Sequence, residues 1–270
     1  MTDPRDTDLA EAAVSALTAQ LTLTPKPGLP DPRDLSVRTS CPDHRSLRWS
    51  AKALLPGLTA MAAAARRAGR PTALLRAELG SIGRCTEHSL EMAGGGHRGA
   101  LWTLGLLVAC AALDPSARGD SIAEAAKRIV AYRDPGAPRR ATHGSAMSVK
   151  YGAAGARGEA RAGFPHVRRA LAVLAASRTA GATEAQARLD ALLTVMASLR
   201  DSELLYAAGP LGLRQVHATA RAVLDAGGTA TPAGTEALTA LDVDLRRRGL
   251  SPRGSAGLLA GALFLDCLPA

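Results

Sequence analysis

Residues 100–113, ALWTLGLLVACAAL, are apolar at almost every position. A helix that is apolar on all sides is a buried helix, and this one is shorter than the roughly 20 residues that a membrane span needs. The fold is therefore expected to form around it. The glycines Gly94 to Gly96 break the preceding helix, because glycine adopts turns that other residues avoid. His97 and Arg98 follow in the first turn of the buried helix, where backbone N–H groups and the helix dipole favour a phosphate.

The segment GGGHRG also has a plainer interpretation, because a glycine-rich connection before a helix is often only a tight turn. It lacks the spacing and the Lys-Ser/Thr ending of a Walker P-loop. Taken alone, the segment leaves both interpretations open.

Alanine and leucine dominate the 270 residues, and aromatic residues make up 3%. Small and unbranched side chains lose little freedom in a helix, so this composition favours helices over strands. We find no alternating strand pattern and no repeat of fixed period. The sequence predicts an all-α fold, a single globular multi-helix domain over residues 1–270. Its charged, glycine-broken segments fall at helix junctions, where helix ends can line a polar site.

Local signals predict several helix ends. A helix over 47–67 is expected to kink near Pro56 and to close at Gly69. Ser251 is a candidate N-cap with Pro252 at the first helical position. Three pairs match the capping box, in which two side chains satisfy backbone N–H groups reciprocally; they are Asp8 with Glu11, Ser121 with Glu124, and Thr183 with Gln186.

Two more segments are candidate site loops. Lys26 lies between two prolines, which fix an extended backbone; the segment is either a linker or a stiff loop that holds an ammonium group toward an anion. Residues 150–163 contain several glycines together with Arg157 and Glu159, which indicates either a site loop or a solvated turn. Residues 134–145 form a basic loop.

The net charge of +9 raises the question of a nucleic-acid partner. The arginines are scattered and few aromatic residues could stack on bases, so polyphosphate substrates explain the charge better, and we expect no nucleic acid. We expect neither a signal peptide nor a membrane span, and the four cysteines (Cys41, Cys85, Cys110 and Cys267) form no CxxC pair. A cytoplasmic protein with reduced thiols and no membrane partner is expected.

Five motifs, in this order, resemble the triphosphoribosyl-dephospho-CoA synthase family. They are TPKPGL (24–29), HRGALWTLGLL (97–107) after a glutamate-bearing helix and a glycine hinge, YGAAGARGEARAGFPHV (151–167), DALLTVMASLRDS (190–202) and LSPRGSAGLLA (250–260). Together they span nearly the whole chain. The third motif resembles the malonate decarboxylase branch more than the citrate lyase branch.

The resemblance implies a pentosyltransferase that moves the triphosphoribosyl group of ATP onto the 2′-hydroxyl of 3′-dephospho-CoA and releases adenine. It also implies that the product goes to the transferase that loads the acyl carrier subunit of malonate decarboxylase. In such chemistry the C1′ centre gains oxocarbenium character, which a carboxylate stabilises. The incoming hydroxyl needs a base, and the leaving adenine needs a proton.

Candidate residues follow from these motifs. The candidate catalytic carboxylates are Glu87, Glu159 and Asp201. The triphosphate calls for cations and Mg²⁺, with Glu87 and Asp201 as candidate metal ligands; which carboxylate is the base stays open. The candidate phosphate-binding residues are Lys26, Gly95, Gly96, His97, Arg98, Arg157, Ser251 and Ser255.

The chain also departs from the family pattern. After PKPG the family has His-x-Asp-x-Asp, whereas this chain has VRTSCPDHR (37–45), with Asp43 retained. Tyr206 begins a run that replaces a His-Arg-Gly-Gly motif, and Gln20 replaces an acidic residue. Because the losses are polar and the apolar frame survives, an alternative hypothesis is a degenerate member that binds a nucleotide or coenzyme derivative without turnover.

Overall fold

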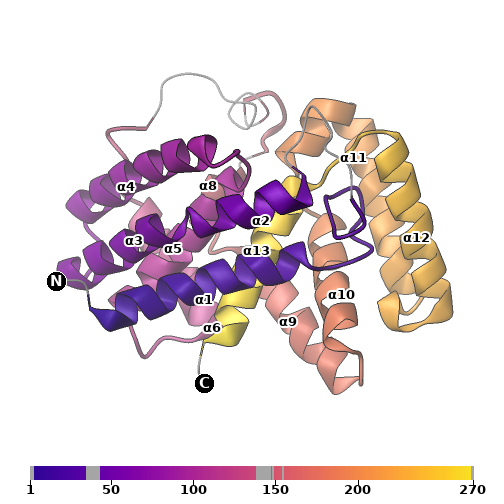
Figure 1. Cartoon of the computed structure of the whole chain (residues 1–270), viewed down its shortest axis with the longest axis horizontal. Coiled ribbons are helices and arrows are strands. Elements are labelled where there is room, and N and C mark those ends of the chain that lie inside the picture. The colour runs from indigo at the N-terminus through magenta and orange to yellow at the C-terminus, as the bar shows by residue number, and fades with distance from the viewer. Residues whose placement is uncertain (1–2, 35–42, 138–146, 148, 154, 269–270) are drawn as a thin grey trace.

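The computed structural model describes residues 3–34, 43–137, 147, 149–153 and 155–268. Within these residues the chain forms twelve α-helices and one 3-10 helix and contains no strand, which confirms the all-α prediction (Figure 1). The elements are α1 (Pro4–Leu21), α2 (His44–Lys52), α3 (Leu55–Ala68), α4 (Ala73–Met92), α5 (Arg98–Leu113), α6 (Gly119–Val130), α8 (Gly155–Arg161), α9 (Pro165–Thr179), α10 (Glu184–Met196), α11 (Ser202–Asp225), η1 (Gly228–Ala230), α12 (Pro232–Arg247) and α13 (Arg253–Cys267).

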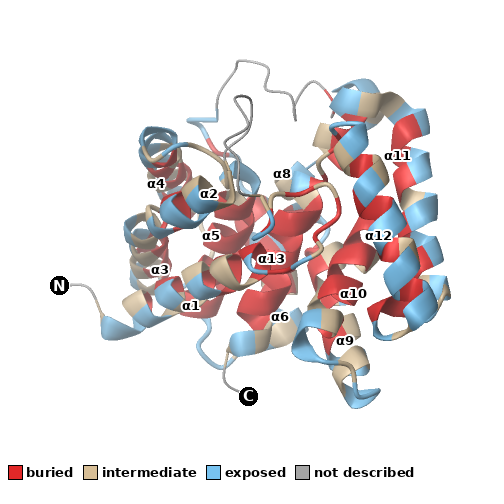
Figure 2. Ribbon diagram, turned by 45° about the vertical axis from the view of Figure 1, so that its right-hand side comes forward, coloured by how far each residue is buried: buried red, intermediate tan, exposed pale blue. Residues whose placement is uncertain are grey.

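Helix α5 forms the centre of the core, as its apolar sequence predicts. Nearly all of its residues are buried, and α3 and α13 pack against it (Figure 2). Two glycines permit this close approach. A Cβ atom on Gly105 would overlap Met61 of α3, and one on Gly261 of α13 would crowd Thr103 of α5. Because aromatic side chains are scarce, the core is filled by small residues that let the helices pack closely together.

Helix α13 lies between two groups of helices, which we call the two halves of the molecule: α1 to α6 with α8, and α9 to α12. It is buried along most of its length and contacts α1 and α5 on one side and α9 and α10 on the other. Helices α11 and α12 pack together beyond α10 (Figure 1). The start of α13 therefore lies where segments from both halves of the chain meet.

Two of the three predicted capping boxes are wrong. Helix α1 begins at Pro4 with Asp3 as its N-cap, because a proline at the first position already has a helical φ. Helix α6 begins at Gly119 after an extended Arg118, which leaves Ser121 inside the helix. The Thr183 and Gln186 box is confirmed by both of its hydrogen bonds.

The predicted helix over 47–67 is two helices, since the chain turns between α2 and α3 just before Pro56. Asp43 caps α2 by accepting the Ser46 N–H at 2.6 Å. Gly69 closes α3 in the left-handed conformation (φ 64°), as predicted.

The glycine-rich segment 150–163 is partly helical, because α8 starts at Gly155.

Ser251 is not the N-cap of α13. The N-cap is Pro252, whose ring supplies no hydrogen bond. The Asp201 carboxylate, which lies at the start of α11, accepts the Ser255 N–H in the first turn of α13 instead.

The 134–145 loop is described only to residue 137, and Cys41 lies outside the described residues. No helix among the described residues is both long and apolar enough to cross a membrane.

Candidate active site

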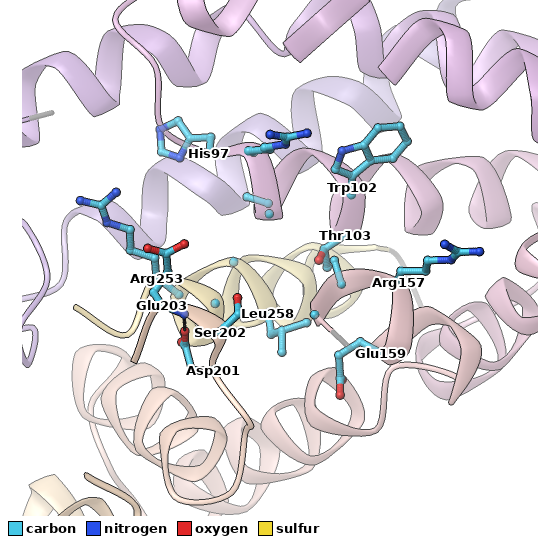
Figure 3. Close-up of a pocket in the computed structure, with 18 of the residues that line it drawn as sticks. His97, Trp102, Thr103, Arg157, Glu159, Asp201, Ser202, Glu203, Arg253 and Leu258 are labelled. Carbon is cyan, nitrogen blue, oxygen red and sulfur yellow. Dashed lines mark hydrogen bonds between the residues drawn. The ribbon is translucent and has the colours of Figure 1, made fainter. Parts of the chain in front are cut away.

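A cavity of about 840 Å³ lies at the junction of the two halves (Figure 3). Its volume falls within the roughly 300–1,000 Å³ of small-molecule sites. Arg98, Ser202 and Arg253, the first residues of α5, α11 and α13, all line it. Because the N-terminal turn of a helix carries unsatisfied N–H groups and a partial positive charge, three helices direct positive ends at one cavity.

Basic side chains outnumber acidic ones on the cavity wall. The basic residues are Lys26, Arg76, Arg84, Arg98, Arg157, Arg200 and Arg253, and the acidic residues are Glu87, Asp134, Glu159, Asp201 and Glu203. Such a wall attracts an anionic ligand.

Most of the residues singled out from the sequence surround this cavity. The candidates that line it are Lys26, Glu87, Gly96, His97, Arg98, Arg157, Glu159 and Asp201. Gly95, Ser251 and Ser255 do not belong to the wall. Ser255 is fully buried beneath it, and its hydroxyl has no hydrogen-bond partner among the described residues.

The glycine hinge shapes one side of the cavity. Gly94, Gly95 and Gly96 all have positive φ (102°, 77° and 83°), which only glycine adopts without strain. The Gly95 N–H donates to the Leu90 carbonyl at 2.7 Å and ends α4. The chain then reverses into α5 and brings Gly96 and His97 to the cavity.

His97 is held in one tautomer. Its Nε2 lies 2.8 Å from the Leu47 carbonyl, which can only accept, so Nε2 carries the proton and Nδ1 is an acceptor in the neutral ring. Burial lowers the pKa of His97, and nearby Lys26 lowers it further. A neutral imidazole suits proton acceptance better than the cationic phosphate contact expected from the sequence.

Lys26 is the most unusual residue of the wall. It is 1% exposed, and its ammonium group has no hydrogen bond or ion pair with the described residues. Burial lowers the pKa of Lys26 to about 7, although Asp31 raises it in part. A buried lysine without a counter-ion is costly unless a ligand supplies the negative charge, which supports its predicted role toward phosphate.

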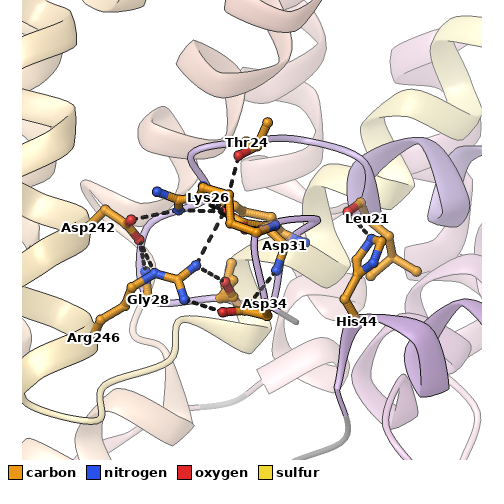
Figure 4. A network of polar contacts seen from close by, with 11 residues as sticks. Leu21, Thr24, Lys26, Gly28, Asp31, Asp34, His44, Asp242 and Arg246 are labelled. Carbon is orange, nitrogen blue, oxygen red and sulfur yellow. Dashed lines mark hydrogen bonds and ion pairs between the residues drawn. The ribbon is translucent and has the colours of Figure 1, made fainter. Parts of the chain in front are cut away.

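A network of ion pairs fixes the loop that carries Lys26 (Figure 4). The Asp31 carboxylate accepts the Lys26 backbone N–H at 3.0 Å. On α12, Asp242 accepts the Gly28 N–H at 3.1 Å and the Arg33 guanidinium at 2.7 Å. Because these contacts hold the backbone on both sides of Lys26, its side chain is directed into the cavity before any ligand arrives.

Asp201 connects two helix starts. Oδ1 accepts the Glu203 N–H at 3.0 Å in α11, and Oδ2 accepts the Ser255 N–H at 3.2 Å in α13. The side chain is 2% exposed, and burial raises the pKa of Asp201 to about 6. Asp201 therefore caps the first turns of both α11 and α13 at the cavity wall.

Glu87, another residue of the cavity wall, is held by two donors. Its Oε1 accepts the Trp102 Nε1–H at 2.5 Å and the Arg98 Nε–H at 2.8 Å. Trp102 can lie against α4 because Gly83 has no side chain, and a Cβ there would overlap the indole ring. The arrangement fixes a carboxylate beside the first turn of α5.

Glu159 contacts a partner outside the cavity. Its carboxylate accepts the His166 backbone N–H at 3.1 Å and lies 2.7 Å from His166 Nδ1. The side chain is drawn directed away from Arg157 (Figure 3). These contacts tie α8 to the start of α9.

The wall fits magnesium only in part. Among the described residues, no three histidine, cysteine or acidic side chains gather as a metal-binding group. Mg²⁺ at nucleotide sites is commonly bound by one or two carboxylates together with phosphate oxygens. Glu87 Oε2 has no hydrogen bond within the described chain, whereas both Asp201 oxygens already accept an N–H.

The sequence interpretation missed Arg76, Arg84 and Asp134, which also line the cavity. The two arginines lie on α4, where charged residues look like an ordinary solvated helix face. Asp134 follows α6 in a turn, and nothing in the sequence links it to α4.

The fold and the cavity define an all-α protein with a site for an anionic small molecule between its helix ends. A family model described as ATP:dephospho-CoA triphosphoribosyl transferase matches residues 6–270. The chain belongs to this family, and it is an enzyme of the triphosphoribosyl-dephospho-CoA synthase type, a transferase, as the motifs predicted.

Curated relatives agree along the whole length. The probable 2-(5″-triphosphoribosyl)-3′-dephosphocoenzyme-A synthase of Pseudomonas fluorescens is 46% identical over 264 residues, 96% of this chain and 90% of the relative. The proteins of the same name from Stutzerimonas stutzeri and Azotobacter vinelandii are 45% and 43% identical; they cover 96% of this chain in both cases, and 91% and 90% of their own lengths. No solved structure matches the chain.

Proposed function

We propose that this chain transfers the triphosphoribosyl group of ATP to the 2′-hydroxyl of 3′-dephospho-CoA and releases adenine. One observation carries the proposal: the buried ammonium of Lys26, which has no hydrogen bond or ion pair with the described residues, lines the same cavity as the starts of α5, α11 and α13. An intact triphosphate supplies the negative charge that such a site lacks. The relatives named as synthases for this product support the choice of substrates.

The residues divide the reaction between them. Lys26 and the helix starts hold the triphosphate, so that C1′ of the ribose lies between Glu87 and His97. Glu87, fixed by Arg98 and Trp102, supplies negative charge as C1′ becomes oxocarbenium-like. The Nδ1 of His97 accepts the proton of the 2′-hydroxyl. The bond from C1′ to N9 of adenine breaks as the new C1′–O bond forms. Solvent water supplies the proton with which adenine leaves, and His97 afterwards returns the hydroxyl proton to solvent.

Magnesium is part of the proposal. When bound it would neutralise part of the triphosphate charge, with Glu87 as its carboxylate; Asp201 would have to give up one of its N–H contacts to join it. We also propose that the protein works in the cytoplasm, where ATP is supplied, and that it needs neither a membrane nor a nucleic acid.

We propose further that the product serves malonate decarboxylase, passing to the transferase that loads the acyl carrier subunit. The form of the 151–167 motif supports this branch. Deleting the gene from its own organism tests it. Loss of malonate decarboxylase activity is expected, and loss of citrate lyase activity alone would contradict the assignment.

The activity is tested directly with the purified protein, ATP, Mg²⁺ and 3′-dephospho-CoA. Free adenine is expected to appear in proportion to a product heavier than dephospho-CoA by the triphosphoribosyl group. If ATP instead raises the melting temperature and no adenine forms, the protein is the degenerate, binding-only member and catalysis is excluded.

A further inference from the structure

A second basic cluster lies on the cavity wall, formed by Arg76 and Arg84 of α4 around Asp134. Arg84 Nη1 donates to Asp134 Oδ2 at 2.8 Å, and Arg76 Nη1 lies 3.5 Å from the same oxygen. Asp134 is 7% exposed. Arg157 of α8 is close enough to Arg76 for their charges to repel.

The positive charge of this cluster is not balanced. The cluster holds three guanidinium groups and one carboxylate: Arg76 and Arg84 both contact Asp134, whereas Arg157 has no hydrogen bond or ion pair with the described residues. Arg76 Nη1 is buried and lacks a hydrogen bond in the described structure. Burial also lowers the pKa of Arg76. A buried donor without an acceptor costs free energy, so an anion in the cavity would stabilise the cluster.

The surrounding backbone is built to fit this cluster. A Cβ atom on Gly80 of α4 would overlap the Asp134 carboxylate, and one on Gly136 would overlap the Arg84 guanidinium. The Asp134 carboxylate is further held by the Gly136 N–H at 3.0 Å. The guanidinium groups are therefore positioned in advance, which favours bidentate contacts to phosphate oxygens.

This cluster and the Lys26 region occupy different parts of the cavity. Arg157 and Trp102 lie at one end of the close-up, while His97, Arg253 and Ser202 lie at the other (Figure 3). His97 is near Lys26, and Arg157 is near Arg76. The wall thus has two separate positive regions.

We propose that Arg76, Arg84 and Arg157 form a second polyphosphate subsite, which binds the diphosphate of 3′-dephospho-CoA while Lys26 and the helix starts bind the triphosphate of ATP. The inference rests on the proposed function, because a transfer between two polyphosphate nucleotides needs two anion subsites with the reacting sugars between them. The more highly charged triphosphate is assigned to the region where α11 and α13 begin.

The test measures the dissociation constants of ATP and 3′-dephospho-CoA separately by titration calorimetry. One variant is Arg76→Gln. The other is Arg157→Gln, which removes a cation without leaving a carboxylate unpaired, because Arg157 has no hydrogen bond or ion pair with the described residues. Arg247→Gln, which breaks an exposed ion pair with Asp244, is the matched control. Melting temperatures identify any variant that does not fold, and the other variant then decides.

Both site variants are expected to weaken dephospho-CoA binding about tenfold or more and to change ATP binding less than about twofold. The control changes neither. Unchanged dephospho-CoA binding overturns the subsite, and weakening of ATP alone overturns the assignment of the two phosphates. If the wild type binds both nucleotides but releases no adenine, the proposed function fails, while the comparison of dissociation constants still decides the subsite.

Discussion

The Asp201 carboxylate accepts the backbone N–H of Ser255, a residue 54 positions away in the chain, at 3.2 Å. Its other oxygen accepts the N–H of Glu203. A single buried acid thereby fixes the first turns of α11 and α13 relative to each other. Since both turns line the cavity, the position of the helix dipoles there depends on this side chain.

Stability should depend on the charge of Asp201. Its folded pKa is raised from 3.8 to about 6, so folding favours the protonated acid. The stability that protonated Asp201 contributes is fully present below pH 4 and is lost as the pH rises from 4 to 6. Above pH 6 the free energy of unfolding no longer changes through this group. Relative to Asp201→Asn, which does not titrate there, the wild type should lose about 3 kcal/mol of unfolding free energy over this interval. Urea unfolding at pH 4, 5, 6 and 7 measures the difference, and parallel curves would refute the prediction.

ATP binding should take up a proton at Lys26. The pKa of the empty site is about 7, and a bound triphosphate raises it, so at pH 8 the ammonium form is largely restored on binding. Calorimetry in buffers of different ionisation enthalpy should report about one proton taken up per ATP, and affinity should fall as the pH rises above 7. Lys26→Met should bind ATP more weakly without proton uptake. Equal proton uptake by the wild type and the Lys26→Met variant would show that a group other than Lys26 takes up the proton.

His97→Gln should lower kcat by about 10²–10⁴-fold, the usual contribution of a general base, while ATP affinity changes little. His44→Gln is the matched control, because His44 Nε2 also pairs with a backbone carbonyl, Leu21 O at 2.9 Å, but His44 does not line the cavity. A His97 variant with normal kcat and weak ATP binding would support the phosphate contact instead.

Asp242→Asn should weaken ATP binding about 3- to 10-fold although the residue lies on α12, because it loosens the loop that presents Lys26. In the Lys26→Met background the same change should have almost no effect, and this non-additivity is the signature of an indirect role. Asp244→Asn on the same helix, which pairs with Arg247 and Arg248, should leave ATP binding unchanged. Additive effects would show that the two residues act independently.

Much of the fold could be predicted because its causes are local. The apolar run of α5, the left-handed Gly69 and the Thr183 capping box each depend on a few neighbouring residues. The predicted start at Ser121 is wrong because another local signal starts the helix earlier. Helix α6 begins at Gly119, directly after an extended Arg118.

The site could be predicted only where residues share motifs. The motifs indicate Lys26, His97 and Arg157 as site residues, and all three line the cavity. The contacts that decide their roles are long-range, such as that of His97 with the Leu47 carbonyl. For Arg84 the partner, Asp134, is 50 positions away, and no local pattern indicates such a pair.

The tie between the Lys26 loop and α12 has a consequence for synthesis on the ribosome. Gly28 meets its acceptor, Asp242, only after 214 further positions have been translated, and α13 comes later still. A nascent chain therefore carries a lysine loop that lacks its contacts with α12 for most of its elongation. The proposed nucleotide site is completed only late in synthesis, so an incomplete translation product should neither sequester ATP nor start the reaction.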